Sequence, residues 1–324
     1  MYEMYNKWGD IVKETLKQEV INARSLSHYR DIAIVGMGGS GIIGDYLQVL
    51  AYGSPRRIFV IKDISLPQWI NKSVLVIAIS YSGNTIETLS AFYQAIDRGC
   101  EVAVVASGGK LLEMATKYGV MHITISKGLV PRAAFPALLY GALKILWSGG
   151  ITDIITEEDA KKALTVLNSA PAMNRSQQIA EFIEDYVPVI IADTRYAPLA
   201  LRFKNEINEN AKMPVKVEVL PEWAHNDIVG WELGSEKFRF LLINPNDNSL
   251  YQKFIEFAES YFKSLGFSVY KLGLEGSTLF EKLMHGTIIA GFTSLLLAER
   301  RGVNPLITES ITMYKEFIKK IFKN

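Results

Sequence analysis

IAIVGMGGSGIIGDYL, residues 32–47, is the stretch of sequence that decides the fold. An apolar run rich in β-branched residues, 32–35, passes directly into a glycine-rich turn, 36–41, and then into a helical pattern. The segment VLVIAISYSGNTIETL, residues 74–89, repeats the order of strand, small-residue turn and helix. Two such units predict parallel strands whose turns meet at the carboxyl edge of one sheet.

Both turns have the composition of an anion-binding site. Glycine lets the backbone approach a ligand closely, hydroxyl groups donate hydrogen bonds, and helix N-termini present unpaired N–H groups. We therefore predict a cradle for a phosphate monoester, built from Gly39, Ser40, Ser80, Ser82 and Thr85.

The first turn also supports a competing interpretation. Gly36, Gly38 and Gly41 satisfy the GxGxxG pattern of dinucleotide-binding folds, and Asp63 lies where such folds place a ribose-binding acid. A nicotinamide-dependent dehydrogenase is therefore an alternative, and so are turns that use small residues for geometry alone. Converging hydroxyls from the second turn suit a terminal phosphate better than the diester of a pyrophosphate, which favours a phosphosugar.

Composition limits the possible partners and location. The 324 residues include 35 basic and 34 acidic side chains, so a net charge of +1 argues against binding to nucleic acid or to a membrane surface. Cys100 is the single cysteine, which fits a reducing cytoplasm. The N-terminal segment predicts an amphipathic helix rather than a signal peptide, and the longest apolar helical stretch, 287–298, is too short to span a bilayer. We expect a soluble cytoplasmic protein.

Val/Ile-rich runs alternate with helical segments along the whole chain. This pattern predicts an α/β fold with two subdomains, each a parallel sheet flanked by helices on both faces. We place the boundary at residue 150, with the phosphate-binding turns in 1–150 and a C-terminal helix in 151–324. The expected strands are 32–35, 58–61, 74–79, 101–105 and 122–125 in the first subdomain, and 187–192, 215–219, 238–243 and 267–272 in the second.

Taken together, GMGGSGIIGDYL and SYSGNTIETL are similar to the sugar isomerase (SIS) domain. Within that group the chain resembles the bifunctional phosphoglucose/phosphomannose isomerases, through Pro131-Arg132, NENAK at 208–212 and PEWAHNDIVG at 221–230. The resemblance implies two SIS subdomains and a homodimer. It also implies isomerisation of glucose 6-phosphate and mannose 6-phosphate to fructose 6-phosphate, with neither metal nor cofactor.

Aldose–ketose interconversion moves a proton between adjacent carbons through an enediolate, and one carboxylate can make both transfers. Glu209 is the candidate base, and burial is expected to raise its pKa from about 4.3 towards about 6 to 7. Glu206 lies three residues earlier on the same helical face, and spacing alone does not separate the two. The resemblance places the catalytic glutamate at Glu209; the alternative is an exposed helix glutamate without a role.

The developing oxyanion requires fixed positive charge. Arg132 is the candidate, because it follows Pro131 and precedes an apolar helical stretch, 133–147, which makes a solvated position less expected. The resemblance puts the enediolate-facing arginine there. A structural salt bridge is the alternative.

Ring opening requires a group that transfers a proton near neutral pH, which favours histidine. His122 and His285 lie in apolar strand and helix patterns and are predicted to be structural. His225, in a loop, matches the ring-opening histidine of the family, which reaches across from the partner subunit. Lys315 matches the family's C-terminal lysine, although the lysines at 319 and 320 also indicate a solvated helix face.

Other classes of function remain as alternatives. Glu281 and His285 share a helical face, but no further histidine or cysteine is near, so we expect no metal site. A non-catalytic phosphosugar-binding regulator would use the cradle without Glu209, Arg132 and His225. Thr287 and Thr293 are candidates for making room for both C2 epimers, and the apolar helix 288–298 that follows Thr287 is expected in the subunit core or at a dimer interface.

Overall fold

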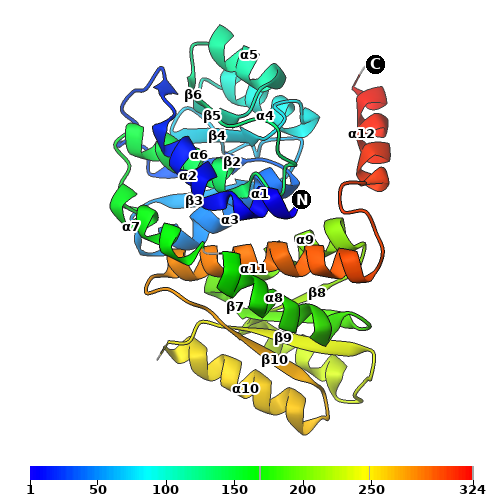
Figure 1. The fold of residues 1–324 in the computed structure, drawn as a ribbon. Helices are drawn as coiled ribbons and strands as arrows, with labels where there is room; N and C mark the ends of the chain where they lie inside the picture. Colours follow the sequence, from blue (N-terminus) through cyan, green and yellow to red (C-terminus); the bar gives the residue numbers. More distant parts are fainter. Residues whose placement is uncertain (168, 248, 323–324) are drawn as a thin grey trace. The chain divides into compact units, whose positions relative to one another are not determined.

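The computed structural model describes residues 1–167, 169–247 and 249–322 (Figure 1). The chain forms two compact units that interleave in sequence. The N-unit contains Lys7–Lys161 and Thr308–Asn324, and the C-unit contains Met1–Asn6 and Lys162–Ile307. The predicted division at residue 150 has no such exchange of ends. In the structure, Met1–Asn6 belong to the C-unit and Thr308–Asn324 belong to the N-unit.

The N-unit is built on a six-stranded sheet in the order β1-β6-β5-β4-β2-β3. All five strands expected here are present, and their neighbours run parallel. The expectation of a purely parallel sheet is wrong in one respect, because β1 pairs antiparallel with β6 at one edge. β1 has only two residues, too few to produce a periodic pattern. The strands are β1 (Val20–Ile21), β2 (Asp31–Val35), β3 (Arg57–Ile61), β4 (Val74–Ser80), β5 (Glu101–Ala106) and β6 (Met121–Thr124).

Helices cover both faces of this sheet. α3 and α6 contact each other and the strands on one face, and α4 and α5 pack against a core on the other face that includes Val76, Phe92 and Leu111. Every residue of the central strand β4 is buried, as its unbroken apolar sequence predicts. The helices are α2 (Trp8–Lys17), α3 (Gly38–Leu50), α4 (Ile86–Asp97), α5 (Gly109–Lys117), α6 (Phe135–Ser148), α7 (Glu157–Lys162) and α12 (Glu309–Ile321).

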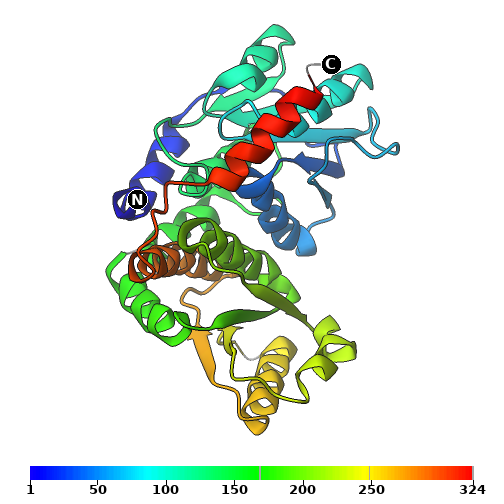
Figure 2. The same cartoon turned by 90° about the vertical axis from the view of Figure 1, so that its right-hand side faces the viewer.

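The C-unit is built on a four-stranded parallel sheet in the order β10-β9-β7-β8. Figure 2 shows α10 on one side of this sheet and α8 and α11 on the other. An aromatic core lies between the sheet and α10, where the rings of Phe240 and Phe262 stack with centroids 3.8 Å apart. The elements are α1 (Tyr2–Asn6), α8 (Ser169–Ile183), β7 (Val187–Asp193), α9 (Ala197–Glu206), β8 (Lys216–Leu220), β9 (Phe238–Asn244), α10 (Leu250–Ser264), β10 (Val269–Gly273) and α11 (Leu279–Arg300).

α11 is the central helix of the C-unit. It contains the apolar stretch 288–298, which is buried within the chain itself except for the half-buried Leu296, and Thr287 and Thr293 have no exposed surface. Gly291 allows α1 to approach, because a Cβ at that position would lie 2.3 Å from the Tyr5 ring. Within the described part of the chain, no helix has the combination of length and apolar character that crossing a membrane requires.

Candidate active site

The two glycine-rich and hydroxyl-rich turns meet at the carboxyl ends of β2 and β4. These strands are parallel neighbours, with Val35 opposite Ala78. The Ser40 Oγ accepts a hydrogen bond of 3.1 Å from the backbone N–H of Tyr81, so the two turns are joined directly. The structure therefore brings the predicted phosphate-binding residues together.

The second turn is held in a tight conformation. The Ser80 Oγ lies 3.0 Å from the Thr85 Oγ1 and accepts a 3.1 Å hydrogen bond from the Gly83 N–H. Gly83 has a φ of +67°, and a Cβ there would lie 1.8 Å from the carbonyl oxygen of Gly108. The Ser82 Oγ accepts from the Asn84 N–H, and Ser82 is exposed. Ser82 is thus the hydroxyl of this turn that is most accessible to a ligand.

Two helix N-termini point their first turns to this edge of the sheet. α3 follows Met37 and α4 follows Thr85, and neither N-cap side chain forms a capping hydrogen bond. The first N–H groups of a helix and its dipole favour an anion. The combination of small residues, hydroxyls and two helix N-termini is suited to a phosphate.

Arg132 lies next to the first of these turns, within the same unit. A Cβ on Gly39 would lie 3.3 Å from the Pro131 carbonyl oxygen and 3.5 Å from the Arg132 Cα. Arg132 is 5% exposed, so the prediction that it is not a solvated surface residue is confirmed. The absence of a side chain at Gly39 lets the backbone of Arg132 come this close to the cradle.

The scaffold behind the cradle is formed by residues that carry no clear sequence motif. The Tyr81 hydroxyl accepts a 2.8 Å hydrogen bond from the Leu129 N–H, and the Ser107 hydroxyl donates to the Tyr81 carbonyl at 2.6 Å. Burial raises the pKa of Tyr81. Asn84 accepts from the N–H of Lys110, the second residue of α5. The readable signal was the small-residue sequence Ser107-Gly108-Gly109 after β5, which lies beside β4 in the sheet.

The two candidate glutamates, both in the C-unit, differ in burial and in hydrogen bonding. Glu206, the last residue of α9, is 1% exposed. Its carboxylate accepts hydrogen bonds from the Tyr5 hydroxyl at 2.7 Å, the Asn210 amide at 2.9 Å and the Arg202 guanidinium. This buried carboxylate, with three donors, holds α1 and α9 together.

Glu209 has a different environment. It is half-buried, in a π-helical turn, Ile207–Ala211, that continues α9. Such turns occur frequently at functional sites. The Lys212 ammonium donates to the Glu209 carbonyl oxygen at 2.8 Å, and the Arg301 guanidinium donates to the Ala211 carbonyl oxygen at 3.0 Å. The backbone that carries Glu209 is therefore fixed, and its side chain is half-buried.

His225 is exposed on a loop that is anchored on both sides. The loop consists of two 3₁₀ turns, Glu222–His225 and Asp227–Trp231. Trp223 and Trp231 are buried in the aromatic core, and the Tyr261 hydroxyl donates to the Ile228 carbonyl at 2.9 Å. The anchors hold the loop in place while leaving the imidazole at the surface.

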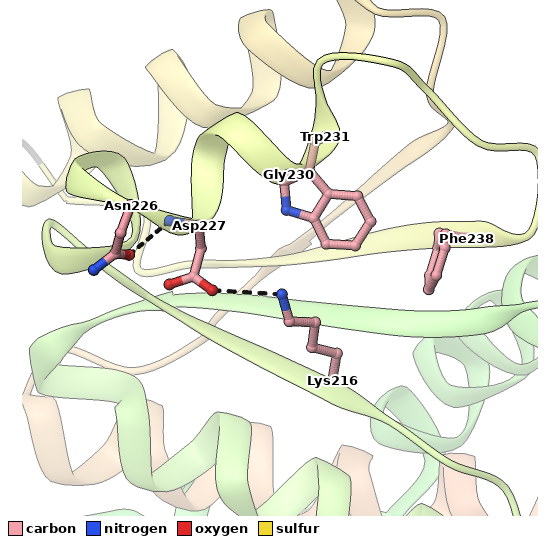
Figure 3. A pocket seen from close by; sticks show the side chains of 6 residues that line it. All are labelled: Lys216, Asn226, Asp227, Gly230, Trp231 and Phe238. Carbon is pink, nitrogen blue, oxygen red and sulfur yellow. Dashed lines mark hydrogen bonds and ion pairs between the residues drawn. The ribbon is translucent and has the colours of Figure 1, made fainter.

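A pocket of about 560 Å³ lies beside this loop (Figure 3). The Lys216 ammonium is 3.6 Å from the Asp227 carboxylate, 2.5 Å from that of Glu218 and 4.9 Å from the centroid of the Trp231 ring. Burial raises the pKa of Glu218, and Lys216 partly offsets that shift. Because the lysine is already paired with two carboxylates, this pocket is a poor phosphate site, and none of the predicted site residues lines it. The lining residues are Lys216, Asn226, Asp227, Gly230, Trp231 and Phe238.

Among the remaining candidates, the lysine is exposed and the two histidines are buried. Lys315 is exposed on α12. His122 and His285 are buried: a His122 ring nitrogen lies 2.9 Å from the Val120 carbonyl oxygen, and the His285 Nδ1 accepts from the Glu275 N–H. Burial lowers the pKa of His285. Their burial agrees with the apolar strand and helix patterns in which they lie. Glu281 accepts backbone N–H groups at the start of α11, and no metal-binding cluster of three or more ligands occurs in residues 1–167, 169–247 and 249–322.

The turn that follows β7 in the C-unit cannot form a second cradle. Arg195 pairs with the buried carboxylate of Asp193 at 3.0 Å and with Asp247 at 3.1 Å, and it stacks over the Tyr251 ring. This charge network occupies the position that glycine and serine have in the N-unit. Asp63, the possible ribose ligand, instead accepts hydrogen bonds from the N–H groups of residues 64 and 65 in its own loop.

Known proteins share both the sequence and the fold. Residues 172–318 match the model of the bacterial phospho-glucose isomerase C-terminal SIS domain. A bifunctional phosphoglucose/phosphomannose isomerase from Aquifex aeolicus (strain VF5) is 34% identical over 325 residues, which cover 98% of this chain and 96% of the relative. The chain belongs to this family. Other proteins described as bifunctional phosphoglucose/phosphomannose isomerases are 30–35% identical, so the resemblance found in the sequence is confirmed.

Two further matches are named for other activities. A D-glucosamine-6-phosphate 4-epimerase from Sulfolobus acidocaldarius is 32% identical over 70% of this chain and 72% of its own length. The C-terminal domain of a glucosamine-fructose-6-phosphate aminotransferase from Francisella tularensis superposes with a TM-score of 0.77 at 15% identity, covering 94% of this chain and 97% of that one. The latter likeness shows the fold alone, and it confirms the SIS-type α/β architecture.

Proposed function

We propose that this protein interconverts glucose 6-phosphate and mannose 6-phosphate with fructose 6-phosphate in the cytoplasm, through an enediolate and without a metal or cofactor. Membership of the isomerase family supports sugar-phosphate isomerisation over the dehydrogenase and over the non-catalytic regulator. The observation that carries the proposal is the pair of hydroxyl-bearing turns joined by the Ser40–Tyr81 hydrogen bond at the N-termini of α3 and α4. Ser82 and the first-turn N–H groups would hold the phosphate.

The chemistry requires a base at the carbon end of the sugar. Glu209 would remove the proton beside the carbonyl and return it to the neighbouring carbon. Glu209 is half-buried in a π-helical turn, a feature that is frequent at functional sites, whereas Glu206 is 1% exposed and its carboxylate accepts hydrogen bonds that link α1 to α9. The buried Arg132 next to Gly39 would stabilise the negative charge that develops on the substrate oxygens, since preorganised charge is usually the largest catalytic contribution.

His225 would open the sugar ring in the active site of the partner subunit of a homodimer. An exposed imidazole on an anchored loop is suited to insertion into a second copy of the chain. Lys315 would complete the site from α12.

A coupled assay tests the reaction itself. Purified protein is given glucose 6-phosphate, mannose 6-phosphate or glucosamine 6-phosphate separately, with excess chelator and without nicotinamide in the isomerisation step. Fructose 6-phosphate is then measured enzymatically, and all sugar phosphates are identified by proton NMR. We expect the first two to be converted at rates that the chelator does not change. Loss of activity that zinc or magnesium restores would refute the metal-free scheme. Epimerisation of glucosamine 6-phosphate at C4, with neither of the other two substrates converted, would place the protein with the epimerase.

Mixing inactive variants tests the shared site. In a twofold dimer that takes the glutamate from one chain and the histidine from the other, a mixed Glu209→Gln and His225→Asn dimer has one intact site of two. Random reassortment makes half of the dimers mixed, so about a quarter of the wild-type activity should return. If the mixture stays inactive while mixed dimers are present, both residues act within one chain.

A further inference from the structure

A hydrogen bond joins the C-terminal helix to the first turn of α4, and both helices belong to the N-unit (α12 and α4 in Figure 1). The Tyr314 hydroxyl donates to the Glu87 carboxylate at 2.9 Å, across 227 positions of sequence. Glu87 is the second residue of α4, which starts directly after the hydroxyl-bearing turn ends at Thr85. It is 7% exposed, and a buried carboxylate depends on its hydrogen-bond donors. The contact is therefore made at the edge of the proposed phosphate site.

α12 has little other attachment. None of its residues is buried. Ile311, Tyr314, Ile318 and Ile321 recur at spacings of three and four, which places them on one stripe of the helix. Since Tyr314 belongs to that stripe, its hydrogen bond to Glu87 fixes the face that α12 turns towards α4. A tyrosine hydroxyl is a donor at neutral pH, and the same bond raises the pKa of Tyr314 further.

Lys315 follows Tyr314 directly, about 100° further around the helix. Rotation or detachment of α12 would carry the lysine away, because no buried contact of the helix holds it in place. We propose that the Tyr314–Glu87 hydrogen bond is the latch that positions Lys315 beside the phosphate-binding turns. Glu87 and Tyr314 are then positioning residues, and this inference rests on the proposed function.

The latch is coupled to the ligand. A phosphate at the N-terminus of α4 would share the positive end of the helix dipole with the Glu87 carboxylate. The added negative charge raises the proton affinity of the Glu87 carboxylate and so strengthens the hydrogen bond that it accepts from Tyr314. Ligand binding therefore tightens α12 against α4. Occupancy of the cradle and attachment of Lys315 thus reinforce each other.

Hydrogen exchange tests the latch without any catalytic assay. Exchange of the α12 amides is followed by mass spectrometry in the wild type, in Tyr314→Phe and in the matched control Tyr52→Phe, whose ring is 92% exposed. We expect Tyr314→Phe to exchange about three- to tenfold faster, as loss of one hydrogen bond from a tyrosine that is 50% exposed implies, and the control to be unchanged. Inorganic phosphate should slow exchange in the wild type only. Equal exchange in all three proteins would overturn the latch.

Kinetics test the positioning of the lysine. Tyr314→Phe should lower kcat/KM about three- to tenfold. Glu87→Gln, which keeps an acceptor oxygen, should lose less than Glu87→Leu. In a Lys315→Met background, Tyr314→Phe should have no further effect, because the group that it positions is gone. Additive losses, or full activity of Lys315→Met, would overturn the inference. A wild type without isomerase activity would refute the proposed function instead, and the exchange measurement would still decide whether the latch exists.

Discussion

Glu206→Gln and Glu209→Gln should affect different properties: the first should lower stability, and the second should abolish turnover. The amide at position 206 keeps the size of the side chain but removes the negative charge from beside the Arg202 guanidinium, which is 1% exposed. It also turns an NH₂ group towards donors, the Tyr5 hydroxyl and the Asn210 amide. Removing one partner of a buried ion pair costs about 3–5 kcal/mol.

The size of the effect can be converted into a melting temperature. At about 2–4 °C per kcal/mol for a unit of 150–250 residues, Glu206→Gln should lower the Tm by about 6–20 °C. Glu209 is half-buried, and its substitution should destabilise the protein less than Glu206→Gln does while abolishing isomerisation. Calorimetry and the coupled assay are run on both variants. A Glu206→Gln protein that melts normally but is inactive, beside an active Glu209→Gln, would show that the two roles have been assigned the wrong way round.

Two substitutions test the cradle. Ser82→Ala should weaken binding of fructose 6-phosphate by about 1.5–3 kcal/mol if the hydroxyl donates to a charged phosphate oxygen, and unchanged affinity by titration calorimetry would remove Ser82 from the site. Gly83→Ala should abolish binding and destabilise the protein by about 2 kcal/mol or more, because the new Cβ meets the Gly108 carbonyl oxygen at 1.8 Å. Gly99→Ala is the control: its φ of +69° is similar but its surroundings are open, so it should bind normally, and equal behaviour of the two variants would disprove the clash.

Much of the fold could be predicted because the relevant signals are local. Apart from β1, the strands of both sheets coincide with runs rich in apolar residues. β4 is buried along its whole length, as its sequence indicates. β1 could not be predicted, since two residues carry no period and their pairing with β6 is set by tertiary contacts. Nor could the interleaving of the two ends of the chain, which depends on contacts such as that of Tyr5 with Glu206, 201 positions away.

The candidate site likewise has parts that the sequence predicts and parts that it does not. The turns at Ser40 and Ser82 were readable from glycine, serine and the preceding strands, and they do meet. Spacing did not separate Glu206 from Glu209, although Arg202, Glu206 and Asn210 lie at intervals of four, which predicts one hydrogen-bonded face of a helix. The Tyr314–Glu87 contact had no signal at all, because each residue taken alone is an ordinary member of an amphipathic helix.

The proton transfer assigned to Glu209 can be observed directly. Fructose 6-phosphate is incubated with the protein in deuterium oxide, and the hexose 6-phosphate products are analysed by proton NMR. We predict that deuterium enters at the carbons beside the carbonyl with the wild type and that Glu209→Gln, folded to the same Tm, incorporates none. Conversion by the wild type with complete retention of the original hydrogen, or continued exchange in the Glu209→Gln protein, would contradict the account.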